Sequence, residues 1–390
     1  MKRNMNLIMK ENKIKVIVNY LPQFHSIPEN DRWWGKGFTD WYATKEAKPL
    51  YKGHKQPRIP KDNNYYDLSD VNTLKWQAHL AKRYGIYGFG IYHYWFNSNM
   101  KLLEKPSELL LANKDIDINF LFIWDNTSWS RTWKKIKFSI DMSPKYSVGN
   151  KEKNNINGDD GVLAKLEYGT KSDWKKHFDY LLQFFNDKRY IKINRKPVFI
   201  VFNPHNEVDV LNNMFTYWDE LAKKNGFDGI FVIGKKNIRH AKISDFEVDY
   251  EPAVSLISSD KLLMKIYMKF MRKFNNKFHK LNLYDYDKVW KRVLKRAKSE
   301  RKKTVFYSGF VTFDDTPRRG EQAIIIQNSN PDKFERYFYQ LLKLSKLHKK
   351  EFVFLTAWNE WGEGAYLEPD EEYEYAYLEA VKKVIEKINN

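Results

Sequence analysis

The sequence predicts an α/β fold, a (β/α)8 TIM-like barrel with long loops on its carboxyl-terminal face. Three observations predict it: short apolar runs recur eight times in 390 residues, segments of helical periodicity separate most of them, and polar or aromatic residues follow most of the runs. Strands that alternate with helices form right-handed βαβ units and a parallel sheet. Eight such units close into a barrel, which carries its chemistry at the carboxyl ends of the strands.

The predicted strands are rich in β-branched and aromatic residues and cover 14–20, 88–94, 118–124, 197–202, 229–234, 246–250, 304–310 and 352–358. Apolar residues at helical spacing predict helices over 71–84, 173–185, 208–224, 261–298, 332–347 and 373–388. We expect a single barrel domain over residues 1–390. It would carry a polar loop insertion near 130–170 and a basic helical insertion near 261–303.

The composition and the absence of certain motifs exclude several classes of site. Hydrophobic residues make up 42% of the chain, enough for a large core, and no cysteine is present, so disulfides and thiolate metal sites are excluded. Neither a metal-ligand spacing nor a phosphate-binding glycine motif occurs, so we expect no metal and no cofactor. The amino-terminal residues do not resemble a signal peptide, and no apolar run approaches the roughly 18 residues of a membrane span. We therefore expect a cytoplasmic protein.

The chain is strongly basic, with a formal net charge of +19 that is densest over 261–303. A solvated lysine-rich insertion would explain this segment, and so would an anionic membrane surface or a phosphate-bearing lipid carrier. Nucleic acid is the weakest explanation, because no nucleic-acid-binding motif accompanies the charge. Peripheral contact with an anionic membrane remains one of the open partners.

The most informative segment follows the last predicted strand, where Trp358-Asn359-Glu360-Trp361-Gly362-Glu363-Gly364 groups two carboxylates, two indoles and an amide. A turn at Gly362 would bring Glu360 and Glu363 toward one pocket. Cleavage of a glycosidic bond needs one protonated and one ionised group, and burial beside a second carboxylate raises the pKa of one of them. We predict these two glutamates as the catalytic pair; the alternative is a pair of surface acids at a loop.

Other strand ends supply the candidate substrate-binding residues, which share a polar or aromatic side chain at the expected active face: Gln23, His25, Trp34, Tyr92, His93, Trp95, Trp124, Asp125, Asn126, Glu251, Asp314, Asp315, Arg318, Trp358, Asn359 and Trp361. For His93 and His25 the competing interpretation is a hydrogen-bonded core histidine. For the two aspartates and Arg318 it is a closed salt-bridge network that holds the loop.

Four motifs resemble the WbsX family: 20–25 (YLPQFH), 33–41 (WWGKGFTDW), 92–96 (YHYWF) and 357–369 (AWNEWGEGAYLEP). The resemblance runs from about residue 14 to 385. Members are described as glycosyltransferases of bacterial O-antigen and capsule clusters, and the family is similar to glycoside hydrolase family 99, the endo-α-mannosidases, which are (β/α)8 barrels. The resemblance therefore implies an oligosaccharide or polysaccharide substrate and bacterial surface polysaccharide metabolism.

The resemblance also implies a division of roles. Glu360 would deprotonate the sugar 2-hydroxyl, which attacks the anomeric carbon to give a 1,2-anhydro intermediate. Glu363 would protonate the leaving oxygen and then activate water or a hydroxyl, with net retention. Two departures concern the substrate: Asp125 and Thr127 stand where related sequences carry alanine and glutamate, and Phe313 and Asp315 stand where they carry tryptophan and asparagine.

Several functions stay open from sequence. The barrel and the glutamate pair favour hydrolysis or transglycosylation. The expected cytoplasmic location favours transfer during polysaccharide assembly, including transfer from a nucleotide sugar, although the chain shows no recognisable phosphate cradle. A non-catalytic glycan-binding scaffold is the alternative from another class. It predicts saccharide binding without turnover.

Overall fold

A computed structural model describes residues 13–130, 162–236, 243–257, 280–300 and 302–390. Within these residues eight parallel strands form the barrel: β1 (Lys15–Tyr20), β2 (Gly88–Asn97), β4 (Asn119–Trp124), β8 (Lys196–Val201), β9 (Phe231–Lys235), β10 (Phe246–Val248), β12 (Val305–Phe310) and β14 (Phe352–Thr356). β1 pairs with both β14 and β2, which closes the ring. The predicted (β/α)8 barrel is confirmed.

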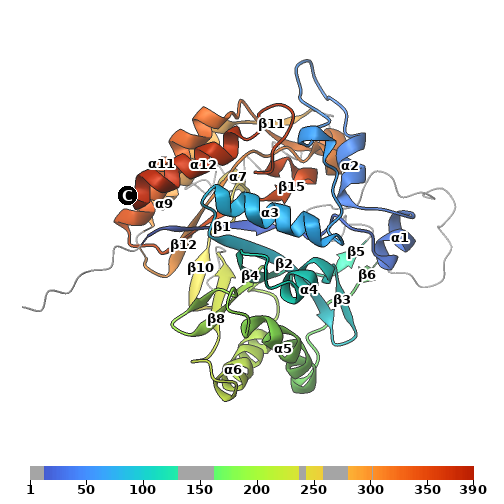
Figure 1. The fold of residues 1–390 in the computed structure, drawn as a ribbon, viewed down its shortest axis with the longest axis vertical. Helices are drawn as coiled ribbons and strands as arrows, with labels where there is room; N and C mark the ends of the chain where they lie inside the picture. The colour runs from blue at the N-terminus through green and yellow to red at the C-terminus, as the bar shows by residue number, and fades with distance from the viewer. Residues whose placement is uncertain (1–12, 131–161, 237–242, 258–279, 301) are drawn as a thin grey trace, which may run out of the picture.

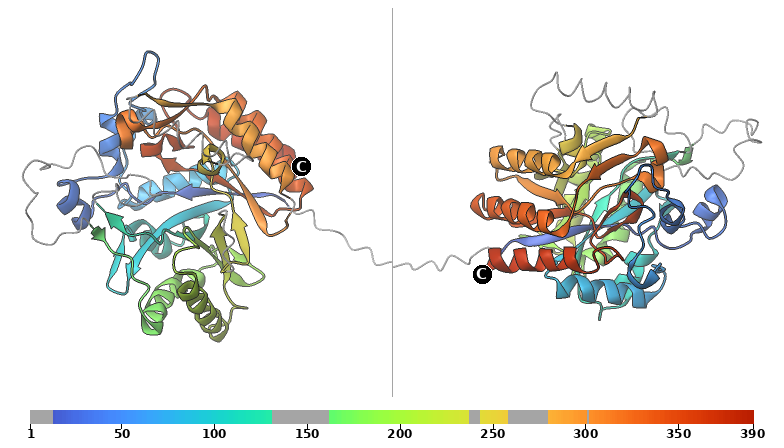
Figure 2. Two further views of the ribbon diagram at one scale, coloured as in Figure 1. Left: turned by 180° about the vertical axis from the view of Figure 1, so that it is seen from behind. Right: turned by 90° about the horizontal axis from the view of Figure 1, so that it is seen from above.

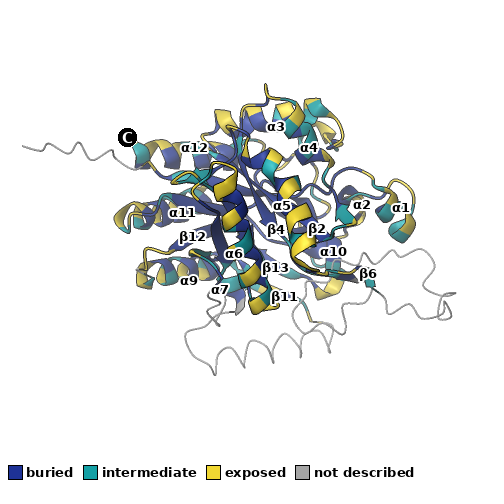
Figure 3. Cartoon of the chain, turned by 90° about the horizontal axis from the view of Figure 1, so that it is seen from below, coloured by how far each residue is buried: buried dark blue, intermediate teal, exposed yellow. Residues whose placement is uncertain are grey.

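Helices surround the barrel (Figure 1). Those that connect or follow barrel strands are α3 (Val71–Arg83), α4 (Lys105–Ala112), α5 (Lys171–Phe185), α6 (Val208–Lys224), α7 (Ala253–Ile257), α9 (Tyr286–Ser299), α11 (Pro331–Leu347) and α12 (Ala376–Asn389). α11 packs on α12, and α5 packs on α6. Figure 2 shows the same ring from behind and from above, and Figure 3 shows that the helices bury one face and expose the other.

Local sequence signals set where several helices begin. Asp70, Asp285 and Asn330 each accept a hydrogen bond from a backbone amide in the first turn of α3, α9 and α11. Thr170 and Asp173 form a reciprocal capping box at the start of α5. Such caps satisfy amide groups that have no partner inside the helix. The helices predicted over 71–84, 173–185, 208–224 and 332–347 lie close to the observed α3, α5, α6 and α11.

Shorter elements decorate the barrel: α1 (Pro28–Trp34), α2 (Asp40–Glu46), η1 (Lys61–Asn63), β3 (Met100–Leu102), β5 (Trp129–Ser130), β6 (Val162–Ala164), β7 (Lys192–Ile193), β11 (Asn282–Asp285), α10 (Thr316–Arg319), η3 (Gly320–Gln322), β13 (Ile324–Gln327), β15 (Asn359–Glu360), η4 (Trp361–Glu363) and β16 (Ala365–Tyr366). The continuous helix predicted over 261–298 is wrong at β11, which pairs with β13. Residues 131–161 and 258–279, the greater part of the two predicted insertions, lie outside the described residues.

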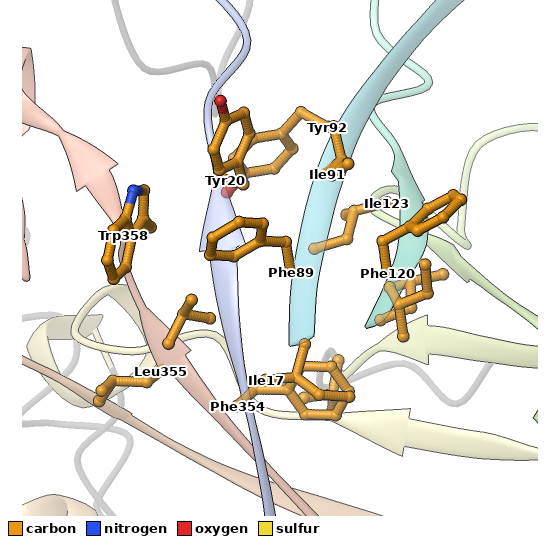
Figure 4. Close-up of a cluster of buried hydrophobic side chains, with 14 of the residues drawn as sticks. Ile17, Tyr20, Phe89, Ile91, Tyr92, Phe120, Ile123, Phe354, Leu355 and Trp358 are labelled. Carbon is orange, nitrogen blue, oxygen red and sulfur yellow. The ribbon is translucent and has the colours of Figure 1, made fainter. Parts of the chain in front are cut away.

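The barrel strands are buried on both faces, inside the ring and against the helices. Figure 4 shows part of this packing, in which Phe89, Tyr20 and Trp358 gather around β1, β2 and the end of β14. The rings of Phe89 and Trp358 lie 5.3 Å apart. Strands of parallel sheets covered by helices have few exposed side chains, so their sequences read as continuous apolar runs. This makes the strands easy to find and the inward-facing residues hard to identify.

Candidate active site

The last barrel strand ends in a tight turn that carries both glutamates. After β14, Glu360 pairs with Ala365 in the short antiparallel ladder β15–β16, and the 3-10 turn η4 carries Glu363. Glu360 directly precedes this turn, and both carboxylates have Arg318 as a common partner. Gly364 closes the turn in the left-handed region, at φ 53°, where glycine is tolerated without a steric penalty. The turn therefore presents Glu360 and Glu363 to one place.

Arg318 of α10 joins the two glutamates. Its Nη1 donates to Oε1 of Glu363 at 2.8 Å, and its Nη2 donates to Oε2 of Glu360 at 3.3 Å. All three side chains are buried. Charge-assisted hydrogen bonds of this kind are stronger than neutral ones and fix the geometry of both partners.

Asp40, at the start of α2, completes the cluster. It accepts from Nε and Nη2 of Arg318 at 3.3 and 3.1 Å, and from the backbone amide of Gly362 at 3.2 Å. A Cβ atom at Gly362 would lie 2.5 Å from Oδ2 of Asp40 and 2.6 Å from Nε of Arg318. Only glycine allows the turn to approach this closely. We refer to Asp40, Arg318, Glu360 and Glu363 as the carboxylate clamp.

The clamp carries three carboxylates around one guanidinium. Burial and the neighbouring charge of Glu363 raise the pKa of Glu360 to about 8, although Arg318 acts in the opposite direction. Like charges in a low-dielectric site disfavour ionisation. Glu360 is therefore the carboxyl group of the clamp that keeps a proton near neutral pH.

Tyrosines form the wall beside the clamp. The hydroxyl groups of Tyr92 and Tyr250 are hydrogen-bonded to each other. Burial raises the pKa of both phenols, and the charges of Glu360 and Glu363 raise it further. Tyr94, two residues after Tyr92 on β2, also has a raised pKa because of burial and of charge on Asp125 and Glu360. Alternation along β2 turns Tyr92 and Tyr94 to the same side.

The sequence interpretation did not identify Asp40, Tyr94 and Tyr250 as site residues. The last two had a usable signal, because each is the last residue of a predicted strand. Asp40 had none beyond its place in a family motif, since it reaches the clamp from a loop 278 positions away from Arg318.

Three predicted substrate contacts face the helices instead, so these predictions are corrected. His93 shares a 2.8 Å Nε2–Nε2 hydrogen bond with His177 of α5, and Trp95 stacks on the same histidine with ring centroids 4.4 Å apart. Trp124 lies against His177 and Tyr168. Burial lowers the pKa of His93 to about 3, so it is neutral. Successive residues of a strand alternate between its faces, and these three occupy the outward positions.

Two predicted acidic contacts, Asp314 and Asp315, are held in structural networks. Asp314 accepts from His54 and Gln56 through Oδ2 and from Thr316 through Oδ1. Asp315 accepts from the amide of Ile324 at 2.6 Å and lies 2.8 Å from Nε of Arg319. For these aspartates the closed-network interpretation fits. Arg318 instead bridges the glutamates.

Glu251 also belongs to the scaffold. Its two oxygens accept from the amide and the hydroxyl of Ser255, and Arg296 is ion-paired with it. The side chain is fully buried. These partners occupy the carboxylate and tie the end of β10 to α7 and α9.

The predicted amides serve the scaffold as well. Asn126 accepts from the amide of Asn203 and donates to the carbonyl oxygen of Asn203 and to Tyr168. Asn359 accepts from the amide of Leu21 and donates to its carbonyl oxygen, which fixes the turn before Glu360 against the end of β1. Both act by positioning neighbouring strand ends.

The two indoles next to the glutamates are core residues rather than an exposed wall. Trp358 is fully buried against Phe89 (Figure 4). Trp361 stacks on Tyr366 at 3.7 Å and donates from Nε1 to Glu368 at 2.7 Å. The expectation that a sugar rests on these two indoles is therefore wrong, because other side chains cover both faces.

The remaining predicted contacts lie in the long loop after β1. The backbone oxygen of Gln23 accepts from the amide of Asp40 at 3.2 Å and so positions the start of α2. His25 is buried, and burial lowers the pKa of its ring. Trp34 lies in α1, and its ring centroid is 6.1 Å from that of Phe38. None of these three has a hydrogen bond to a clamp side chain within the described part of the chain.

Among the described residues, no group of three or more His, Cys, Asp or Glu side chains is arranged to hold a metal ion. No helix in the same part of the chain combines the length and apolar character needed to cross a membrane.

Fold and site define a (β/α)8-barrel protein with a buried carboxylate pair at the carboxyl ends of its strands. The family described as Glycosyltransferase WbsX matches residues 16–381. The chain therefore belongs to the WbsX glycosyltransferase family.

Comparisons with individual proteins agree with this family. Two Xanthomonas campestris pv. campestris proteins described as "Uncharacterized protein WxcX", from strains B100 and ATCC 33913, are each 28% identical over 379 residues, covering 95% of this chain and 49% of the relative. The chain thus spans about half the length of these curated relatives.

Solved structures share the fold. A GH99 endo-alpha-mannosidase from Bacteroides thetaiotaomicron superposes with a TM-score of 0.53 at 12% identity, covering 96% of this chain and 97% of that one. A glycoside hydrolase-like protein superposes with the same score at 13% identity, covering 96% and 94%. At these identities the likeness concerns the architecture alone.

Proposed function

We propose that this chain is a carbohydrate-active enzyme that cleaves or transfers a glycosidic bond in a bacterial surface polysaccharide, using Glu360 and Glu363. The observation that carries the proposal is the carboxylate clamp: two buried glutamates bound to one guanidinium, with a raised pKa on Glu360. Buried carboxylates whose protonation states differ are what acid–base chemistry on a sugar needs. Family membership supports the same class of substrate.

The clamp favours retention of configuration. Glu363 accepts from Nη1 of Arg318 and Glu360 accepts from Nη2, so one planar guanidinium holds both carboxyl groups. Retaining glycosidases hold their carboxyl groups about 5–5.5 Å apart, whereas inverting enzymes leave about 6.5–9.5 Å for a water molecule. Contact of both carboxyl groups with one guanidinium fits the shorter separation, about 5–5.5 Å, that retaining enzymes have.

The protonation state of the free site fits the second half of the implied reaction. In the first half, Glu360 takes the proton of the 2-hydroxyl, the 2-oxygen attacks the anomeric carbon, and Glu363 gives its proton to the leaving oxygen. This leaves Glu360 protonated and Glu363 ionised, the arrangement that the unliganded clamp favours. Glu363 then deprotonates the attacking water or hydroxyl, and Glu360 returns its proton to the 2-oxygen.

The first half therefore requires the proton to move from Glu360 to Glu363 when substrate binds. A sugar 2-hydroxyl that donates to Glu360 favours its ionised form. Arg318 already contacts both carboxylates and can stabilise either charge. Arg318 is thus a positioning residue for both states of the pair.

The proposal is tested by incubating the protein with free and undecaprenyl-linked mannose-type oligosaccharides, with and without nucleotide sugars, followed by mass spectrometry. We expect a new or shortened glycan without any nucleotide sugar, and Glu363→Gln should reduce its formation about 10²–10⁴-fold. The exposed Glu374→Gln is the matched control and should keep full activity. Turnover that requires a nucleotide sugar would support the donor-dependent alternative. Saccharide binding without turnover in any arm would support the scaffold alternative.

A further inference from the structure

Three polar side chains beside the clamp take no part in the proposed acid–base step. Tyr94 lies in β2, Asp125 directly follows β4, and Lys235 is the last residue of β9. All three therefore lie toward the carboxyl ends of barrel strands, the face that carries the clamp. The strand register brings them together: His93 of β2 pairs with Trp124 of β4, Trp124 with Val201 of β8, and Val201 with Gly234 of β9, and Tyr94, Asp125 and Lys235 each follow one of these paired positions.

The ammonium group of Lys235 is held by aromatic rings rather than by a carboxylate. Its Nζ lies 3.6 Å from the ring centroid of Phe202 and 4.6 Å from that of Tyr250. It forms no ion pair within 4.0 Å with any of the residues that the structure describes. Burial lowers the pKa of Lys235 to about 8, yet the group is still mainly charged at pH 7. A partly buried charge that contacts only rings gains from a polar partner that a ligand can supply.

Asp125 offers the complementary acceptor. Its Oδ1 accepts from the hydroxyl of Thr127 at 2.5 Å, and Oδ2 has no hydrogen-bond partner in the described part of the chain. Burial raises the pKa of Asp125 to about 6, so the carboxylate is mainly ionised at pH 7. Both Asp125 and Lys235 remain partly exposed, whereas the clamp glutamates are buried.

We propose that Tyr94, Asp125 and Lys235 form a subsite for an uncharged sugar ring beside the clamp, in which Asp125 accepts from one ring hydroxyl and Lys235 donates to another. A hydroxyl group both donates and accepts, so a pair of them satisfies a carboxylate and an ammonium that do not reach each other. The subsite rests on the proposed function in one respect: the ring is taken to belong to the substrate of Glu360 and Glu363.

Charge balance decides the class of sugar. Within the subsite the charges of Asp125 and Lys235 oppose each other, and in the clamp Arg318 is ion-paired with Asp40 and Glu363. A uronic acid would place another negative charge near Asp125 and Glu363. An amino sugar would place a positive charge near Lys235 and Arg318. A neutral hexose leaves no charge unopposed.

The test measures binding rather than turnover. Wild-type protein, Lys235→Met and Asp125→Asn are titrated by ligand-observed NMR with methyl α-glycosides of mannose, glucose and galactose. The best neutral ligand is then compared with its C6 carboxylate and its 6-amino-6-deoxy analogue. We expect the neutral glycoside to bind best, and each substitution to raise its Kd about tenfold, since one hydrogen bond to a charged group is lost.

Lys236→Met is the matched control. This neighbouring lysine is ion-paired with Glu300 at 2.6 Å, so its loss should leave the Kd unchanged. Thermal unfolding and near-ultraviolet circular dichroism establish that each variant is folded.

Three results would overturn the subsite: no binding of any neutral glycoside to the wild type, an unchanged Kd in folded Lys235→Met and Asp125→Asn proteins, or tighter binding of a charged analogue. Loss of turnover in Glu363→Gln with normal glycoside binding would leave the subsite intact. A failure of the subsite is thereby separated from a failure of the proposed chemistry.

Discussion

Two glutamates eight residues apart, Glu360 and Glu368, show how equal burial produces different chemistry. They are 4% and 3% exposed, and burial raises the pKa of Glu360 to about 8 and that of Glu368 to about 7. Glu368 accepts from three neutral donors: Gln77 at 2.7 Å, Tyr66 at 2.8 Å and Trp361 at 2.7 Å. Glu360 accepts from one guanidinium at 3.3 Å, which it shares with two other carboxylates.

The difference lies in whether the carboxyl group can still change partners. Fixed neutral donors occupy both oxygens of Glu368, so its network stabilises one conformation. Glu360 has a single shared partner and a neighbouring carboxylate with which it can exchange a proton. A raised pKa alone therefore does not distinguish the proposed catalytic glutamate from one that belongs to a structural network.

The sharpest test of this comparison is activity. Glu360→Gln should lower turnover of the oligosaccharide about 10²–10⁴-fold, because the amide cannot accept the proton of the 2-hydroxyl. Glu368→Gln should retain turnover within about tenfold of wild type, since it lies outside the proton-transfer path. The measurement is product formation per folded molecule. Equal losses in the two variants would contradict the comparison.

Stability should respond in the opposite order. Glu368→Ala leaves the three donors unpaired and creates a cavity, so we expect a loss of about 4 kcal/mol in the free energy of unfolding. Glu360→Gln replaces a protonated carboxyl group by a neutral amide of nearly the same shape, and Arg318 keeps Glu363 and Asp40, so the change should stay within about 1 kcal/mol. Urea denaturation of both variants measures this. A larger loss for Glu360→Gln would mean that the clamp is mainly structural.

A third prediction concerns Asp40, which shares the partner Arg318 with Glu360 but is not one of the two glutamates compared. Asp40→Asn removes a negative charge that raises the pKa of Glu360, so that pKa should fall. Turnover should fall about tenfold, because Arg318 loses two hydrogen bonds to a charged acceptor. Carbon-13 NMR of the Glu360 carboxyl group and the pH–rate profile give the two readouts. Glu46→Gln, exposed at the end of the same helix, is the control and should change neither.

The smallest expected effect is on the pH dependence of stability. Both glutamates have folded-state pKa values above the ordinary value of 4.5. Their stabilising contribution is fully present below about pH 4.5 and is lost as the pH rises through 7 for Glu368 and 8 for Glu360. Between pH 6.5 and 7.5, Glu360→Gln should lose about 1 kcal/mol less than wild type in urea denaturation. An identical slope in both proteins would refute the raised pKa of Glu360.

Much of the barrel was predictable, and the errors have a common cause. Apolar runs separated by helical periodicity located all eight strands, and the motif after the last one located the glutamates. The misassigned residues His93, Trp95 and Trp124 lie on strands with aromatic residues on both faces. Because such strands bury both faces, their sequence shows no alternation that would separate inward from outward positions.

The sequence by itself determined the order of strands and helices and the placing of two glutamates on one turn, since both follow from local periodicity and from glycine. Only the tertiary structure decided which hydrogen-bond partners each polar side chain has within the protein. Asp40, Arg318 and Glu360 come from three separate segments of the chain. Hydrogen-bond partners so distant in sequence meet only when the barrel closes, and their meeting sets the charge on each carboxyl group.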